Sequence, residues 1–430
     1  MILWGDIVRK KKTSFKDLFK KKDKHKKIEK KKISTREKEE GFNLFEVIVI
    51  IFISVLFGVI VGCIISSSKI GLVGAEVSTE LQEVITTYDN IISEYYDKVD
   101  EKELMNAAIS GMVSVLDDPH STYLNSNDTY SFNQTVDGEY VGLGITITWM
   151  DGVCTIVEVM DNSPAEKQGL KVGDVIVAVD ANDVTASTLD EISSLLTGSE
   201  GSSVSVTVER EGERKDFTVK RSVIEIKSAL SKVIKKDDSK IGYIYVDTFA
   251  SNTAKQFSKE LKKLEKKNVD SLIIDVRNNS GGRLSQVKEI LDEFLGNKVE
   301  IYRIETKGKV EKVYTSDKIK RNIPVVVLVN EGSASASEIL ATAFMDRYKN
   351  ATIVGTVTYG KGTIQKAVEL SSGASLKYTT QKWLTSKGEY LQDKGLTPDI
   401  EVNQKGEYYD NPTDENDAQL QKAIEVLTTK

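Results

Sequence analysis

A serine-rich run at 333–337, Ser-Ala-Ser-Ala-Ser, stands between an apolar stretch typical of a buried strand and another typical of a helix. A serine at such a junction lies near the free N–H groups and the positive end of the helix, which can stabilise a developing oxyanion. Serine also caps helix N-termini for structural reasons alone. The position therefore permits a nucleophile without requiring one.

Lys361 stands between Gly360 and Gly362, and Gln365 follows four residues after the lysine. An exposed lysine has a pKa of about 10.4 and is protonated at neutral pH, but burial can lower that pKa to roughly 7–8. The two glycines allow neighbouring chain to pack against the lysine, and a glutamine is a neutral partner that does not restore the charge. A surface lysine in a β-turn is the ordinary alternative for a Lys-Gly pair.

The segment 140–145, Tyr-Val-Gly-Leu-Gly-Ile, indicates a binding loop. Gly142 and Gly144 bracket Leu143 in a loop that can turn backbone N–H groups toward one anion. The N–H groups of Leu143 and Ile145 are the expected donors to the terminal carboxylate of a peptide, whose backbone would pair with the strand edge. An apolar final side chain is expected to fit against Leu143 and Ile145. A glycine-containing turn in an ordinary β domain is the alternative.

The periodicity of the sequence predicts the elements that position these residues. Apolar residues at helical spacing between 81 and 116 predict two helices, divided near 97–100. Short β-type runs between turn residues predict a small β-rich module over 138–221. From 240 onward strands and helices alternate, and the nearly continuous apolar strands predict a sheet covered on both faces. The predicted elements are strands at 241–246, 271–276 and 324–329, helices at 254–266, 284–295 and 337–347, a strand-rich segment to 402, and a last helix at 417–427.

Two sets of motifs resemble known families. Residues 140–145 together with 163–176 (SPAEKQGLKVGDVI) are similar to a bacterial PDZ domain. The serine run, the lysine segment and 275–282 (DVRNNSGG) together resemble the tail-specific, or carboxy-terminal processing, serine proteases. That resemblance extends over roughly residues 80–428, through further matches at 116–124, 395–399 and 417–424.

The resemblance implies a role for each residue of the site. In this family the middle serine of the run is the nucleophile, the glycine-flanked lysine is the general base, and the glutamine orients the lysine. These residues are Ser335, Lys361 and Gln365. The implied oxyanion donors are the backbone N–H groups of Gly281 and Ala336. The implied reaction is acyl transfer to the serine followed by hydrolysis, in protein or peptide substrates with free C-termini.

The expected fold class is α/β, with a crotonase/ClpP-like protease core, an inserted β-rich PDZ domain and an N-terminal transmembrane helix. One departure from the family pattern concerns Thr197, because many members carry at that position an arginine that links the PDZ domain to the core. Threonine cannot make that charged contact, so the coupling stays open. The expected parts are a basic cytoplasmic tail (1–44), a transmembrane helix (45–66), a helical region (77–125), the PDZ domain (126–222) and the protease core (223–403 and 413–428).

Charge is divided unevenly along the chain. The first 40 residues carry a formal charge of +9 against −6 for the whole chain, so the remainder carries −15. An uncharged run at 47–65 would span about 28 Å as a helix, close to the thickness of a bilayer core. The lysine-rich segment before it predicts a cytoplasmic N-terminus and an extracytoplasmic catalytic domain in the cell membrane. Because the folded part is acidic, a nucleic-acid partner is not expected.

The remaining composition narrows the alternatives. Cys63 and Cys154 provide no disulfide framework and no metal-type spacing, and no metal or organic cofactor is expected. A cleaved signal peptide is disfavoured by the long charged stretch before the apolar run, although 60–63 loosely resembles a lipoprotein cleavage box and leaves lipidation of Cys63 open. The substrate, the activating signal and a homo-oligomeric state also stay open.

Two other functions are compatible with parts of the sequence: a trypsin-like PDZ protease and a PDZ-containing adaptor with an inactive protease core. The segment 279–282, Asn-Ser-Gly-Gly, mimics the nucleophile loop of trypsin-like PDZ proteases, with His120 as the base for Ser280. The order of segments argues against it, because His120 lies on the far side of the β-rich module from that serine. A PDZ-containing adaptor with an inactive protease core would tolerate loss of Ser335 or Lys361, and both are present.

Overall fold

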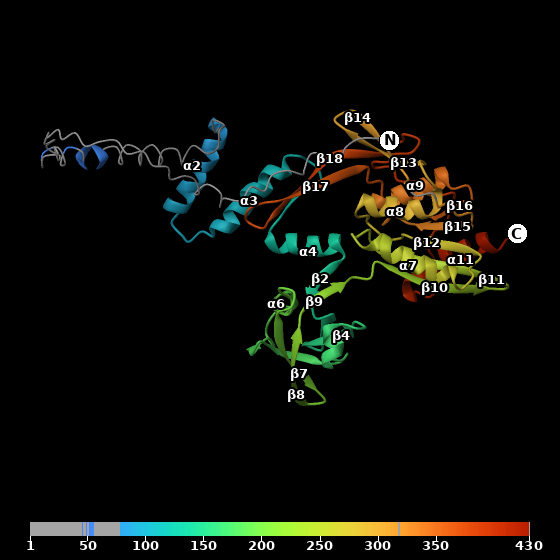
Figure 1. Cartoon of the computed structure of the whole chain (residues 1–430), viewed down its shortest axis with the longest axis horizontal. Helices are drawn as coiled ribbons and strands as arrows, with labels where there is room; N and C mark the ends of the chain where they lie inside the picture. The colour runs from blue at the N-terminus through green and yellow to red at the C-terminus, as the bar shows by residue number, and fades with distance from the viewer. Residues whose placement is uncertain (1–44, 46–48, 50, 56–77, 317–318, 430) are drawn as a thin grey trace, which may run out of the picture. The chain divides into compact units, whose positions relative to one another are not determined.

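The computed structural model describes residues 45, 49, 51–55, 78–316 and 319–429 (Figure 1). The chain forms two compact units, 1–96 and 97–430. The predicted transmembrane helix at 45–66 lies mostly outside the described residues, as does the basic tail at 1–44. Among the described residues, no helix has the length and apolar content needed to cross a bilayer.

The helices predicted between 81 and 116 are present, with the break where the sequence indicated it. In the first unit, α2 (Thr79–Glu94) begins at Ser78, whose hydroxyl accepts the Leu81 N–H at 3.3 Å. In the second unit, α3 (Glu101–Ser114) begins at Asp100, whose carboxylate accepts the Glu103 N–H at 2.9 Å. Each cap satisfies a helix N–H that has no partner within the helix.

The central sheet of the second unit has the strand order β10-β11-β12-β15-β16-β19. All neighbours pair in parallel except β10 and β11. The strands predicted at 241–246, 271–276 and 324–329 are confirmed as β11, β12 and β15. The strand bounds are β10 (Ala229–Lys236), β11 (Ser239–Val246), β12 (Ser271–Asp275), β15 (Val325–Val329), β16 (Ala351–Gly355) and β19 (Ile400–Glu401).

Helices cover both faces of this sheet, as the continuous apolar strands predicted. Leu272 and Ile274 of β12 pack with the helices of one face, whereas Ile273 packs with a helix on the other. Because side chains alternate along a strand, consecutive residues of β12 serve two separate hydrophobic cores. The first face carries α7 (Thr253–Glu265), α8 (Leu284–Leu295) and α9 (Ala336–Arg347), and the second carries α11 (Ala418–Thr428); the short α10 (Gly406–Asp410) precedes α11.

A second sheet supports the lysine segment and was only partly foreseen. Its strand order is β1-β18-β13-β14, and β17 also pairs with β18, from Ser375 to Lys382. The hairpin of β13 and β14 was missed, because its alternation of charged and apolar residues is a weak signal without the partner strand β18. The bounds are β1 (Thr122–Leu124), β13 (Glu300–Thr306), β14 (Lys309–Tyr314), β17 (Thr363–Glu369) and β18 (Ser375–Thr385).

The β-rich module predicted over 138–221 is present, with the strand order β3-β4-β5-β7-β8 and its own core. The helix α4 (Ser126–Asp137), which precedes the module, was not predicted, because its sequence is polar and begins with turn-forming residues. Strands β2 (Glu139–Gly142) and β9 (Ser222–Glu225) pair where the chain enters and leaves the module. The bounds within it are β3 (Ile145–Met150), β4 (Val153–Val159), α5 (Pro164–Gln168), β5 (Val175–Val179), β6 (Asn182–Asp183), α6 (Leu189–Leu196), β7 (Ser203–Arg210) and β8 (Glu213–Lys220).

Candidate active site

The parallel strands β12, β15 and β16 are neighbours in the central sheet. Because the carboxyl ends of parallel strands meet at one edge of a sheet, the loops that follow them lie together. The loop after β12 carries Gly281, the loop after β15 carries Ser335, and the loop after β16 carries Lys361. The fold therefore gathers three motifs that are separated by up to 80 residues of sequence.

Ser335 occupies a constrained position at the start of α9. Its φ of +53° lies in the left-handed region, which is unfavourable for a residue with a side chain, and the residue is only 9% exposed. The neighbouring serines hold the turn in place. The Ser333 hydroxyl donates to Val276 O at 2.7 Å, and the Ser337 hydroxyl donates to Asn279 O at 2.8 Å. Strain of this kind costs roughly 1–3 kcal/mol and persists only where surrounding contacts impose it.

The two implied oxyanion donors lie beside the serine. A Cβ atom on Gly281 would lie 3.0 Å from Ser335 Cβ and 3.1 Å from Ala336 N, so only glycine allows this approach. The Ala336 N–H, in the first turn of α9, has no acceptor among the described residues. The Gly281 N–H instead donates to Asn279 Oδ1 at 2.8 Å. One of the two donors is thus free in this structure and the other is occupied.

Lys361 is half-buried on the opposite side of the site. Burial lowers its pKa, the positive charge of Lys377 lowers it further, and the charges of Asp118 and Glu338 oppose the shift. The packing predicted around the flanking glycines is confirmed. A Cβ on Gly360 would lie 2.6 Å from Gly395 N, and one on Gly362 would lie 2.5 Å from the Tyr390 ring.

A buried carboxylate, Glu338, connects the serine loop to the lysine loop. Glu338 is fully buried, and its Oε2 accepts the N–H groups of Ser335 at 2.7 Å and Lys361 at 2.9 Å. Its Oε1 accepts the Thr358 hydroxyl at 2.6 Å and the Gly360 N–H at 2.8 Å. The sequence analysis missed this residue. Its spacing of three residues after Ser335, which is that of a capping box, was the available signal.

The implied partner of the lysine, Gln365, points to threonines in this structure. Its Nε2 donates to Thr363 Oγ1 and to Thr379 Oγ1, each at 2.9 Å. Among the described residues no hydrogen bond joins Gln365 to Lys361, or the Ser335 hydroxyl to the lysine ammonium. The groups share one site, but the final contacts of a catalytic dyad are not made here.

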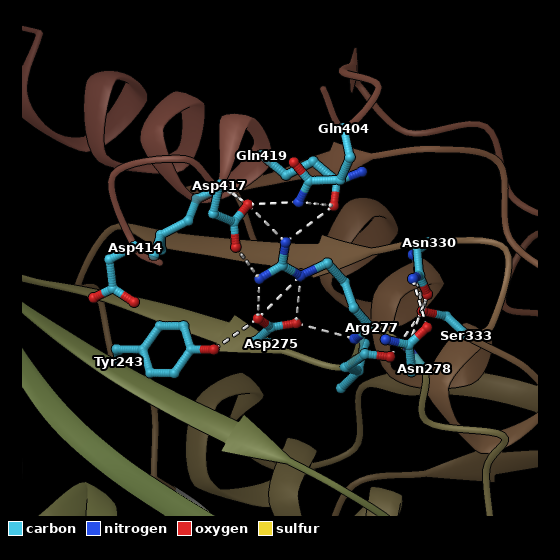
Figure 2. A network of polar contacts seen from close by, with 12 residues as sticks. Tyr243, Asp275, Arg277, Asn278, Asn330, Ser333, Gln404, Asp414, Asp417 and Gln419 are labelled. Atoms are coloured by element: carbon cyan, nitrogen blue, oxygen red, sulfur yellow. Dashed lines mark hydrogen bonds and ion pairs between the residues drawn. The ribbon is translucent and has the colours of Figure 1, made fainter. Parts of the chain in front are cut away.

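A buried ion cluster fixes the start of the Gly281 loop (Figure 2). The Arg277 guanidinium forms ion pairs with Asp275 at 2.6 Å and with Asp417 at 2.8 Å. Asp417 begins α11, so the cluster joins the C-terminal helix to the end of β12. Next to it, Asn278 and Asn330 exchange hydrogen bonds of 2.8 Å, which tie the Gly281 loop to the loop that carries Ser335.

The binding loop of the β-rich module has the shape expected of an anion site. The carbonyls of Leu143 and Gly144 accept the N–H groups of Ala165 at 3.0 Å and Met160 at 2.9 Å. The N–H groups of Leu143 and Gly144 have no acceptor among the described residues, so Gly144 adds a donor that the sequence analysis did not name. Gly142 ends β2, and Ile145 begins β3, which lies at the edge of the module's sheet.

One expectation about this loop is corrected. The Leu143 side chain is 2% exposed and packs in the module's core, so it cannot form the open apolar wall that was predicted. Burial of this side chain is what fixes the loop on the module. Apolar side chains do remain available on β3, where Ile145 and Ile147 are half-buried and Trp149 and Met150 are exposed.

The C-terminus of α6 is capped by the side chain of Arg221. The residue that follows the helix, Thr197, is where many family members carry an arginine. The guanidinium of Arg221 donates to Leu195 O at 2.7 Å and to Leu196 O at 3.0 Å. A cation at this place satisfies the last carbonyls of α6. The Thr197 position itself carries no charged contact to the core among the described residues.

The rival pairing of His120 with Ser280 receives no support. Burial lowers the pKa of His120, and the positive charge of Lys361 lowers it further. Ser280 is exposed, and within the described part of the chain no hydrogen bond connects it to His120.

Comparisons with known proteins identify the family of the chain. Family models match the chain as peptidase family S41 over residues 240–402, as a PDZ domain over 141–220, and as the N-terminal domain of the activating protease CtpB over 66–128. The carboxy-terminal processing protease CtpB of Bacillus subtilis (strain 168) is 36% identical over 327 residues, which cover 75% of this chain and 68% of that protein. The chain belongs to the carboxy-terminal processing serine proteases of family S41.

Other similar proteins are also named as serine or C-terminal processing proteases. A probable CtpA-like serine protease of Staphylococcus haemolyticus (strain JCSC1435) is 36% identical over 339 residues, covering 78% of this chain and 67% of that protein. Among solved structures, the photosystem II D1 C-terminal processing protease is 28% identical and covers 76% of this chain and 94% of its own, with a TM-score of 0.44. The family models and the two curated relatives confirm the carboxy-terminal processing protease family and the PDZ domain that the sequence predicted.

Proposed function

We propose that this S41 protease is a membrane-anchored endopeptidase in which Ser335 and Lys361 form the catalytic dyad. The main support for this proposal is the Glu338 carboxylate, which accepts the backbone N–H groups of both residues through one oxygen, Oε2. A shared acceptor keeps the two segments adjacent through their backbone N–H groups. Among the described residues the Glu338 carboxylate forms no hydrogen bond with the Ser335 hydroxyl or the Lys361 amine.

In this mechanism the Ser335 oxygen attacks a peptide carbonyl while Lys361 takes the hydroxyl proton. The lysine then gives a proton to the leaving amine, and water releases the acyl group from the serine. The lowered pKa of Lys361, caused first by burial and then by Lys377, supports this role because a neutral amine is needed to accept the proton. Gln365 would orient that amine once its oxygen accepts from the lysine.

The oxyanion of the tetrahedral intermediate would be held by backbone N–H groups. The Ala336 N–H is free at the positive end of α9, where negative charge is stabilised. The Gly281 N–H becomes the second donor when it leaves Asn279 Oδ1, its acceptor in this structure. A small rotation of the Gly281 peptide, permitted by its φ of +111°, would accomplish this change.

Substrates are proteins and peptides presented by their C-termini. The free N–H groups at Leu143 and Gly144 suit a terminal carboxylate, and the edge strand β3 suits an added peptide strand. Capture by the C-terminus would raise the local concentration of the substrate chain at the protease. The adaptor alternative lacks a supporting observation, because Ser335, Lys361 and the Glu338 contacts are all intact.

Replacement of Ser335 or Lys361 by Ala is expected to reduce kcat on an unfolded model protein such as casein by on the order of 10⁴-fold or more. Each change removes an atom that forms or breaks a bond in the reaction. Cleavage by purified full-length protein is the measurement, with circular dichroism to verify folding. Lys366→Ala, on the same strand as Gln365 but exposed, is the matched control and should retain activity.

The trypsin-like alternative makes the reverse prediction for the same assay. His120→Ala and Ser280→Ala should leave most of the activity if the dyad is correct. Loss of cleavage in a folded His120→Ala protein, together with activity in Lys361→Ala, would refute the dyad.

The membrane anchor is proposed from the sequence alone, through the uncharged run at 47–65 and the +9 segment before it. In intact cells a membrane-impermeant fluorophosphonate is expected to label Ser335, and external protease should spare the first 40 residues. A Ser335→Ala strain controls for labelling of other serines. Labelling that requires cell lysis would reverse the proposed orientation.

A further inference from the structure

The turn at 118–121 links α3 to the sheet that carries the lysine segment. Strand β1, which follows the turn, pairs with β18, and Thr122 lies opposite Lys377. The Asp118 carboxylate accepts the His120 N–H at 3.0 Å through Oδ1 and the Ser121 hydroxyl at 2.6 Å through Oδ2. The turn is therefore folded around the carboxylate of Asp118.

Hydrogen bonds continue from this turn to Gln365. The Ser121 hydroxyl gives its only proton to Asp118, so its oxygen is free to accept the Thr379 N–H at 3.1 Å. Thr379 of β18 lies opposite Gln365 of β17, and its Oγ1 accepts from Gln365 Nε2 at 2.9 Å. Burial raises the pKa of Asp118, but hydrogen bonds from Ser121, the Thr379 side chain and the His120 N–H outweigh burial and keep this pKa below its ordinary value.

An ionised carboxylate only accepts hydrogen bonds, and this decides the direction of the chain of contacts. The Thr379 side chain is among the groups whose hydrogen bonding lowers the pKa of Asp118, and its Oγ1 accepts from Gln365 Nε2 at 2.9 Å. The Gln365 amide nitrogen also donates to Thr363 Oγ1, so both of its protons are used. The Gln365 oxygen is then the atom left for a donor. Lys361 lies two residues before Thr363, just ahead of the start of β17.

We propose that Asp118 is a positioning residue that fixes the orientation of the Gln365 amide. Its carboxylate acts through Ser121 and Thr379 and leaves the Gln365 oxygen to accept from the lysine. A neutral amine that donates one N–H to Gln365 keeps its lone pair for the Ser335 proton. The inference rests on the proposed dyad. It connects the turn at 118–121, which precedes the PDZ domain, to the proposed base Lys361 through hydrogen bonds.

Charge alone predicts a different result, which makes the inference testable. The groups that face Lys361 are Lys377 on β18, Glu338 on α9, and Asp118 and the neighbouring His120 on the turn. Because the charge of Asp118 raises the pKa of Lys361, its removal would shift the acid limb of the pH–rate profile to lower pH and leave the plateau unchanged. A positioning role predicts that the plateau itself falls.

The experiment measures the rate at which a saturating fluorophosphonate labels Ser335 in the full-length chain, from neutral to alkaline pH. Asp118→Ala is expected to lower the plateau about tenfold or more, because the lysine is no longer aligned. In a Gln365→Ala protein the same change should have no further effect, since Asp118 acts through that amide. The matched control is Asp117→Asn, an exposed neighbour at a φ of +49° that Asn tolerates.

A second pair of variants covers the case in which Asp118→Ala fails to fold. Thr379→Val removes the hydroxyl at constant shape and should lower the plateau, whereas Thr379→Ser should restore it. An unchanged plateau in a folded Asp118→Ala protein, or additive losses with Gln365→Ala, would overturn the positioning role. Labelling that survives in Lys361→Ala would instead overturn the dyad, so the two failures are distinguishable.

Discussion

The candidate protease site and the PDZ loop both contain backbone N–H groups that we propose bind an oxygen anion, but the two are assembled differently. The loop at 142–145 is one contiguous segment whose carbonyls are tied to the adjacent chain, which leaves its N–H groups free. The protease site joins loops from three strands, and its order depends on the buried carboxylate of Glu338. We therefore expect the PDZ loop to be disrupted mainly by substitutions within the loop itself. The protease site can also be disrupted by substitution of a supporting residue that does not contact substrate.

Buried charge is handled in two ways within the protease core. Glu338 is fully buried, forms no ion pair among the described residues, and is satisfied by backbone N–H groups and the Thr358 hydroxyl. The nearby Arg277 cluster instead balances one guanidinium against Asp275 and Asp417. Backbone donors make the carboxylate sensitive to small shifts of the loops that carry Ser335 and Lys361. We therefore expect effects of graded size as changes move from Glu338 to the PDZ loop.

Among residues that take no direct part in the reaction, Glu338→Ala is expected to have the largest effect. The change leaves buried donors on both the serine loop and the lysine loop unpaired, and each costs about 1–3 kcal/mol. We expect the free energy of unfolding to fall by about 4 kcal/mol or more, and kcat to fall by about 10²-fold because the reactive groups separate. Urea denaturation and casein cleavage are the measurements.

Glu331→Gln is the matched control for that change, because Glu331 lies in the same loop but is exposed and accepts only the Thr356 hydroxyl. It should alter neither quantity appreciably. Normal kcat in a folded Glu338→Ala protein would show that the two loops hold their places without the carboxylate, and the contrast with the PDZ loop would disappear.

The smallest effect is expected at the PDZ loop. Amidation of a peptide's C-terminus removes one charge-assisted contact to the free N–H groups, worth roughly 1.5–3 kcal/mol, so binding should weaken about tenfold or more. Calorimetry with matched free-acid and amidated peptides on the full-length Ser335→Ala protein measures this without cleavage.

Gly144→Ala provides a protein-side control for the amidation experiment. A Cβ at this position would lie 2.4 Å from Ser163 Cβ, and the φ of +78° suits glycine, so the variant should bind both peptides weakly. Equal affinities of the wild-type loop for the two peptides would exclude carboxylate recognition and leave β3 as a general strand-pairing edge.

Much of this molecule could be anticipated from local sequence. The helix at 284–295 was predicted with both ends correct, because its apolar spacing is regular and Gly296 follows it. The buried strands of the central sheet were recognisable as short apolar runs. The β13–β14 hairpin and α4 were missed, because neither has a strong period of its own and both depend on neighbours distant in sequence.

The candidate site divides in the same way. Residue types and spacing, together with a family resemblance, indicated Ser335, Lys361 and Gln365, since reactive residues occur in characteristic local settings. Only the tertiary structure identified Glu338 as the common acceptor and Asp118 as the origin of a chain leading to Gln365. Hydrogen-bond direction and burial depend on which strands become neighbours, and that pairing is a property of the folded chain.

The sequence by itself determined which chemistry is available: a serine before a helix, a lysine between glycines and an N–H-rich loop before a strand. The tertiary structure decided how those groups are held. It packed Gly281 so closely against the serine loop that an added Cβ would lie 3.1 Å from the Ala336 nitrogen. It also buried the Leu143 side chain, which therefore does not line a pocket. Local patterns encode backbone preference and reactivity, whereas distances between distant segments arise only when the hydrophobic cores on both faces of the sheet close.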